Sequence, residues 1–179
     1  MLINILIVLT VVVVVFVVIV AMRPSEFRVE RSEAMSAPAP AVFAWVNDLH
    51  KWQEFSPWAK IDPAAKTTFS GPSDGVGAVF EWAGNKQVGE GRMTIIESRP
   101  NELVRFRLDF LKPFAGTNTA EFTFRPDGDQ TVVTWTMTGK NNFLFKAVGL
   151  FMNCDKMVGA QFEKGLANLK GLVEVGGKE

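Results

Sequence analysis

An uninterrupted apolar run near the N-terminus restricts this chain more than any other feature. Residues Leu2 to Ala21 include only two polar side chains, Asn4 and Thr10. Twenty residues at about 1.5 Å each form a helix of about 30 Å, the hydrocarbon thickness of a bilayer. Most of the run is β-branched and would favour strands and aggregation in water, whereas lipid forces the backbone to satisfy its own hydrogen bonds as a helix. The run therefore predicts a transmembrane anchor over residues 1–22.

The main alternative for this segment is a cleaved signal peptide. No Lys or Arg precedes the run, which is also longer than the roughly 7–15 residues of a signal-peptide core. Val20-Ala21-Met22 is a weak cleavage site. A retained anchor is the favoured interpretation, and a buried core helix is the least favoured because the run is apolar on every face.

The charges that flank the run predict its orientation. Arg23, Arg28 and Arg31 follow it closely. The positive-inside rule then predicts a single-pass protein whose C-terminal domain lies in the cytoplasm. The opposite orientation would place the domain in the periplasm or outside the cell.

The composition excludes several classes of function. Lys and Arg total 19 and Asp and Glu total 19, so no net charge is available to hold nucleic acid. One Cys and one His exclude disulfides within the chain, cysteine metal clusters and paired-histidine metal sites. We therefore expect no metal, no cofactor and no nucleic-acid partner. The chain has 15 Phe and no Tyr, so its aromatic side chains lack hydroxyl groups and are suited to contacts with apolar molecules.

The remainder predicts one domain over residues 27–175, with a juxtamembrane linker at 23–26 and a tail at 176–179. Helical spacing after Pro38 and Pro40 predicts a helix over residues 41–49 and a further turn over 50–55. A long helix is expected from residue 142 to about 175, with a break near Asn153-Cys154. Period-two alternation predicts seven strands, at Phe27–Met35, Lys66–Ser70, Ala78–Ala83, Gln87–Ser98, Leu103–Leu111, Asn118–Arg125 and Thr131–Thr138.

The strands have one aromatic and one polar face. We predict that the aromatic face points toward the last helix and that a hydrophobic ligand contacts it there. The candidate ligand-binding residues are Phe80, Trp82, Met93, Ile95, Phe106, Leu108, Phe110, Phe122, Phe124, Trp135 and Met137 from the strands, with Phe151 and Phe162 from the helix. Two interpretations stay open: a filled core, or a pocket lined by these side chains.

Four segments, in this order, resemble the polyketide cyclase/dehydrase branch of the START/Bet v1-like (SRPBCC) superfamily. They are DLHKWQEFSPWAK at 48–60, GVGAVFEWAGNKQVGEGRMTIIESRPNELVRFRL at 75–108, TVVTWTMTG at 131–139 and FEKGLANLKGLVE at 162–174. The resemblance covers residues 27–175. It implies an α+β helix-grip fold, in which a curved antiparallel sheet of about seven strands wraps around a long C-terminal helix and encloses a cavity. Members bind lipids, sterols, quinones, polyketides or hormones there, and some are enzymes.

The aromatic face contains no carboxylate, His or Lys, so no catalytic residue is predicted. A bulge at Gly89–Gly91 would turn Glu90 or Arg92 inward as a polar anchor; without it they lie on the outer face. His50 is expected at the surface or at a helix cap. Cys154 is expected as a small core residue. Further expectations are that Asp155 and Lys156 form a solvated pair and that Asn118 points inward. Trp52 and Trp58 are core residues in the favoured interpretation, and a pocket gate or an interfacial aromatic pair in the alternatives.

These features predict membrane-anchored binding or transport of a hydrophobic small molecule or lipid, in a cavity between the sheet and the C-terminal helix. One alternative is an enzyme of the polyketide cyclase/dehydrase type acting on a hydrophobic substrate. A buried ionisable group in the cavity would favour this alternative. The other is a protein-interaction module with a filled core, which the lack of a cavity would favour.

Overall fold

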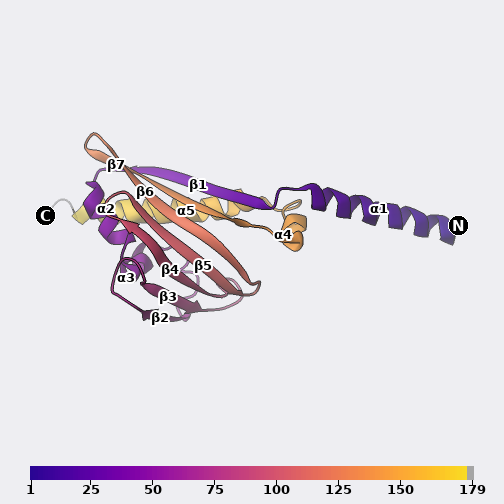
Figure 1. The fold of residues 1–179 in the computed structure, drawn as a ribbon, viewed down its shortest axis with the longest axis horizontal. Helices are drawn as coiled ribbons and strands as arrows, with labels where there is room; N and C mark the ends of the chain where they lie inside the picture. The colour runs from indigo at the N-terminus through magenta and orange to yellow at the C-terminus, as the bar shows by residue number, and fades with distance from the viewer. Residues whose placement is uncertain (177–179) are drawn as a thin grey trace.

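A single apolar helix projects from one end of a curved sheet in the computed structural model, which describes residues 1–176 (Figure 1). This helix, α1 (Leu2–Met22), is exposed along its length except at Val20. It is the one helix within residues 1–176 that is long and apolar enough to cross a membrane. Residues 177–179 of the expected tail lie outside the described part of the chain.

The domain that follows α1 contains the seven predicted strands. They are β1 (Glu26–Met35), β2 (Lys66–Ser70), β3 (Val79–Ala83), β4 (Glu90–Arg99), β5 (Leu103–Lys112), β6 (Gly116–Asp127) and β7 (Gln130–Lys140). They form one antiparallel sheet in the order β1-β7-β6-β5-β4-β3-β2. Consecutive strands from β2 to β7 are neighbours, and β1 pairs with β7. The expected meander is confirmed.

Four further helices follow, and prolines or capping side chains mark the start of several of them. Pro38 and Pro40 start α2 (Ala39–Val46), and Asp48 caps α3 (Leu49–Phe55) by accepting hydrogen bonds from the amides of His50 and Lys51. The predicted long C-terminal helix is divided into α4 (Phe143–Val148) and α5 (Cys154–Gly176), and this confirms the expected break. The side chain of Asn153 accepts a hydrogen bond from the amide of Lys156 at 2.9 Å and so caps the start of α5.

Helix α5 packs lengthwise along β1 on the inner face of the sheet (Figure 1). The ring of Phe162 stacks on that of Trp135 with centroids 4.1 Å apart and an interplanar angle of 6°. One turn further along α5, Gly165 faces the same indole, and a Cβ there would lie 2.7 Å from the Trp135 ring. The absence of a side chain at Gly165 therefore lets α5 approach the sheet closely.

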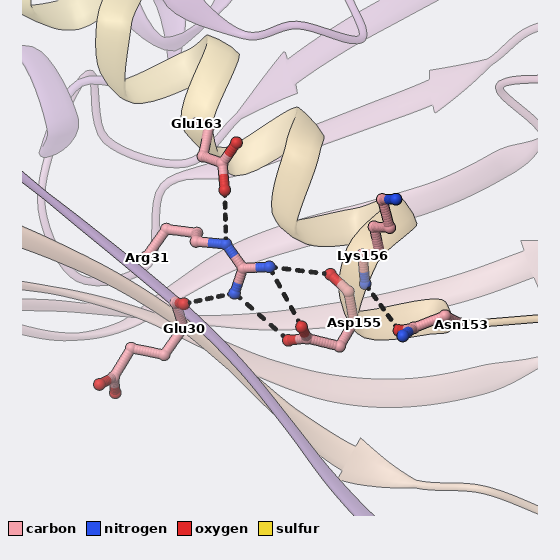
Figure 2. Close-up of polar contacts among 6 residues, drawn as sticks. All are labelled: Glu30, Arg31, Asn153, Asp155, Lys156 and Glu163. Carbon is pink, nitrogen blue, oxygen red and sulfur yellow. Dashed lines mark hydrogen bonds and ion pairs between the residues drawn. The ribbon is translucent and has the colours of Figure 1, made fainter.

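Polar contacts with β1 hold the start of α5 in place (Figure 2). The Arg31 guanidinium donates to Glu163 Oε1 at 2.8 Å, to Asp155 Oδ2 at 3.1 Å and to the carbonyl of Asp155 at 3.2 Å. It also donates to its neighbour's carbonyl, on Glu30, at 2.7 Å. Hydrogen bonds to Asp155 and Glu163 raise the pKa of Arg31. Asp155 is thus an ion-pair partner of Arg31, which corrects the expectation of a solvated pair with Lys156.

A glycine again makes room for this contact, because a Cβ on Gly159 would collide with the Arg31 guanidinium. Further along α5, Lys170 Nζ contacts Glu33 at 2.6 Å, and Glu174 accepts from the amide of Ser36 at 2.7 Å. Strand β1 and the residue that follows it are therefore connected with helix α5 at three successive levels.

Replacing Gly165 with Ala is expected to lower the free energy of unfolding by about 1–3 kcal/mol, because the added methyl meets the rigid Trp135 ring. The matched control is Gly171→Ala in the same helix, where nothing lies within 4 Å of the added carbon. That variant should gain about 0.5–1 kcal/mol from helix propensity. Guanidinium unfolding of the full chain in detergent micelles, followed by tryptophan fluorescence, measures both. Equal changes in the two variants would contradict a close packing of α5 on Trp135.

Replacing Arg31 with Met is expected to speed amide hydrogen exchange in residues 154–163, because the start of α5 loses its contacts with β1. Mass spectrometry of the full chain measures the exchange. Arg28→Met is the control, since Arg28 lies on the same strand but pairs with Glu30 on the outer face. Identical exchange in the two variants would show that Arg31 does not hold α5.

Candidate ligand-binding face

The strand residues predicted to bind ligand share the inner face of the sheet. Directly paired residues of antiparallel strands lie on the same face. The pairs Phe80–Met93, Met93–Leu108, Ile95–Phe106, Phe122–Trp135 and Ala120–Met137 connect the set across the sheet. The alternation of residues along the strands therefore predicted correctly that these side chains lie on the inner face.

One half of this face is filled by interlocking rings. We call it the closed half, and it consists of Trp52, Phe55, Phe106, Phe122, Trp135 and Phe162, all at most 5% exposed. The Trp52 ring lies 5.2 Å from Trp135, 5.6 Å from Phe106 and 5.7 Å from Phe122 in edge-on or tilted arrangements. Such geometry is favourable for aromatic rings and leaves the centre of the domain as a packed core. The interpretation as a filled core therefore holds for this half.

The other half of the face is apolar but only half-buried. We call it the open half, and it consists of Phe27, Trp82, Leu108, Phe110 and Met137. The rings of Trp82 and Phe110 meet edge to face at 6.0 Å. Register places these residues near the strand ends that face α1, since Glu26 pairs with Lys140 and Phe110 with Gly116. The open half is thus an apolar surface at the α1 end of the sheet.

The orientation of Trp82 depends on a glycine in the next strand. Gly91 pairs with Trp82, and a Cβ at Gly91 would collide with the indole. The indole N–H of Trp82 donates to the carbonyl of Val88 at 3.3 Å. The ring therefore lies flat across β4 and presents an apolar surface.

Few polar atoms belong to the closed and open halves, whereas Arg31 and Glu33 of β1 lie on the same inner face and contact α5. Asn118, beside the open half, lies over Gly139, whose missing side chain leaves room for the amide. In the closed half, Trp135 Nε1 is buried and makes no hydrogen bond in the described structure, and the same holds for Gln53 Nε2 on α3. The inward position of Asn118 was predicted from the sequence, whereas Gln53 and Phe27 were not among the candidate residues. Alternation from Val29 places Phe27 on the inner face, whereas the side on which Gln53 lies depends on how α3 docks.

Several acids and bases of β3, β4 and β5 lie on the outer face. Arg92 donates to Glu81 at 2.7 Å there, so Arg92 does not turn inward. The expected irregularity is present as a register shift between Glu90 and Gly91, and Glu90 accepts from Lys112 at 2.8 Å. Asp109 accepts from the hydroxyl of Thr117 at 2.7 Å and from Arg107, and these contacts lower the pKa of its carboxyl. Within residues 1–176 no group of three or more His, Cys, Asp or Glu side chains is placed to hold a metal ion.

Of the other residues considered in the sequence, some lie where they were predicted and others do not. His50 is exposed beside the capped start of α3, as expected, and its ring stacks on Phe69 at 4.0 Å. Trp52 is a core residue and Trp58 packs against the core. Cys154 is exposed rather than buried. Phe151 does not join the inner face and is 81% exposed. The break before α5 puts both of these residues outside the part of the helix that covers the sheet.

Two hollows in the described structure lie away from the space between α5 and the closed half. One, of about 160 Å³, is lined by Leu49, His50, Phe69 and residues 70–73. The other, of about 550 Å³, lies between the end of α1, α4 and the start of α5. Neither hollow corresponds to the expected cavity between sheet and helix, and the centre of the domain there is the packed closed half.

Solved structures support the fold. CV1439 from Chromobacterium violaceum is 16% identical and aligns over 85% of this chain and 99% of its own, with a TM-score of 0.59. TTHA0849 from Thermus thermophilus is 18% identical over 84% of this chain and 99% of its own, with a TM-score of 0.60. The di-domain ARO/CYC protein StfQ of the steffimycin biosynthetic pathway is 12% identical over 87% of this chain and 53% of its own, with a TM-score of 0.61. No curated protein sequence matches this chain.

The family assignment comes from a sequence match to almost the whole domain. The pattern of the family described as "Polyketide cyclase / dehydrase and lipid transport" matches residues 26–174, from the first residue of β1 nearly to the end of α5. The seven-stranded antiparallel sheet and the long C-terminal helix agree with the helix-grip architecture of Bet v1-like proteins. The chain therefore belongs to the polyketide cyclase/dehydrase and lipid transport family of the SRPBCC superfamily.

Proposed function

We propose that this protein binds a hydrophobic small molecule or lipid on the open half of its inner face, while α1 anchors the domain to a membrane. The observation that carries the proposal is the half-buried apolar surface formed by Trp82, Leu108 and Phe110 at the α1 end of the sheet. An apolar ligand that covered this surface would remove it from water. Each Å² of apolar surface removed contributes about 25 cal/mol before the costs of association are subtracted.

Binding without catalysis fits the chemistry of this face best. The open half offers apolar side chains and the amide of Asn118, which can orient a polar group of a ligand. General acid–base catalysis would need a titratable side chain within hydrogen-bond distance of the substrate. Charged side chains of the nearby strands are engaged in ion pairs, Glu81–Arg92 on the outer face and Glu90–Lys112 at the strand ends.

A second candidate is a protein-interaction module, and the closed half supports it. Rings fill the centre of the domain, so a module of this type would work through its surface and would need no ligand. The two functions differ in what they require of the open half, because only ligand binding depends on the side chains of this half.

The anchor proposal rests on α1 and on the charges that follow it. The helix exposes apolar side chains on all sides, which is unfavourable in water and favourable in lipid. With Arg23, Arg28 and Arg31 after the span, we propose a single-pass protein with its domain in the cytoplasm. Transport would then mean delivery of the ligand to or from the same membrane.

Leu108→Gln is expected to weaken ligand binding tenfold or more, because an amide without partners costs about 1–3 kcal/mol when an apolar ligand buries it. The control is Arg107→Gln, the neighbouring residue on the exposed outer face. The full chain is released from nanodiscs for native mass spectrometry, and its apolar adduct is identified after organic extraction. Absence of an adduct from the unaltered protein, with no uptake from an added panel of lipids and quinones, would favour the interaction module. An adduct that is still present in the Leu108→Gln variant would show that the ligand binds outside the open half.

The cytoplasmic orientation predicts that a membrane-impermeant maleimide does not label the full chain in intact cells. Cys154 is the only cysteine of the sequence and is exposed in the structure, so labelling is expected once the membrane is permeabilised. Cys154→Ser provides the background. If intact cells are labelled as strongly as permeabilised cells, the domain lies on the opposite side of the membrane.

A further inference from the structure

Exposed apolar side chains of the domain are concentrated at the α1 end. We call five of them the apolar rim: Phe114, Phe143, Leu144, Phe151 and Met152, which are 45–81% exposed. They come from the β5–β6 connection, from α4 and from the α4–α5 connection. Single exposed apolar residues are common on protein surfaces, whereas a group of large ones indicates a surface that is covered in the working protein.

Contacts unite these segments beside the end of α1. The ring of Phe114 meets that of Phe145 on α4 at 5.5 Å, edge to face. Lys146 Nζ donates to the carbonyl of Ala21, in the last turn of α1, at 3.1 Å. Figure 1 shows α4 next to the end of α1, on the side of the domain from which the apolar helix projects.

The rim borders a hollow that combines cations with apolar walls. Arg23 and Lys146 contribute positive charge to this hollow of about 550 Å³, and Phe151 and Met152 contribute apolar surface. Glu26 is the acidic residue of its lining. Cations above an apolar surface suit the boundary of a bilayer, where phosphate groups lie next to acyl chains.

The short connection after α1 restricts what can cover the rim. Residues 23–25 separate α1 from β1, and three residues span at most about 11 Å. If α1 crosses the bilayer, this connection holds the start of β1 within that range of the lipid surface. The hydrogen bond from Lys146 to Ala21 holds α4, which carries Phe143 and Leu144, beside the same end of α1. A protein partner would have to enter this narrow space, whereas lipid is already there.

We propose that the domain docks on the bilayer that holds α1, with the apolar rim inserted at the boundary between headgroups and acyl chains. This inference rests on the anchor of the proposed function and adds a second contact between protein and membrane. Docking fixes the orientation of the domain and turns the open half of the inner face toward the lipid. A hydrophobic ligand can then pass between bilayer and protein with little exposure to water.

Spin labels on the full chain test the docking. Single cysteines are introduced by Phe151→Cys or Leu144→Cys in the rim, in a Cys154→Ser background. Val175→Cys, which replaces an exposed apolar residue at the far end of α5, is the matched control, and Val12→Cys reports on the middle of α1. The proteins are reconstituted in vesicles of dioleoyl-phosphatidylcholine and dioleoyl-phosphatidylglycerol. Power saturation compares collisions with oxygen, which is enriched in lipid, and with a nickel chelate, which stays in water.

Docking predicts an oxygen-to-nickel ratio several-fold higher at residues 144 and 151 than at residue 175, and highest of all at residue 12. A rim as accessible to nickel as residue 175, with residue 12 deep in lipid, would overturn the docking and leave the anchor intact. Nickel access at residue 12 would overturn the anchor and the docking together. Ligand binding is measured separately by the adduct, so its failure is distinguishable from both.

Discussion

The stacking of α5 on β7 organises this domain. Phe162 and Trp135 lie face to face at 4.1 Å, and Gly165 allows the helix to approach the same indole. Arg31, Lys170 and Glu174 then connect the helix with β1. Because α5 begins level with Arg31, it leaves the α1 end of the inner face half-buried. The open half of the inner face follows from where α5 binds.

The two halves of the aromatic face differ in how far their side chains are buried. The closed half supplies the packed core that a small domain needs to be stable. The open half keeps similar side chains partly accessible at the end nearest α1. Family membership supports the proposal of a hydrophobic ligand on the open half, and the proposed docking of the apolar rim would let this ligand exchange with the membrane rather than with water.

Periodicity predicted the strands well because it depends on local geometry. Every second residue of a strand lies on one face, so alternation alone placed Phe80, Leu108 and Trp135 on the inner face. Helix positions were harder to predict. Phe151 and Cys154 were expected to lie with the helix over the sheet. The chain leaves the helical path between α4 and α5, so Phe151 in that connection and Cys154 at the start of α5 are both exposed. Asp155 was assigned to solvent because its partner, Arg31, is 124 residues away in the sequence.

By itself, the sequence determined the apolar helix, the seven strands, the identity of the aromatic face and the family, because local periodicity and residue order carry that information. The tertiary structure alone decided which part of the aromatic face is filled, which cations meet which carboxylates, and where the exposed apolar residues gather. These properties depend on the register of the strands and the position of α5, which arise from contacts between residues far apart in the chain.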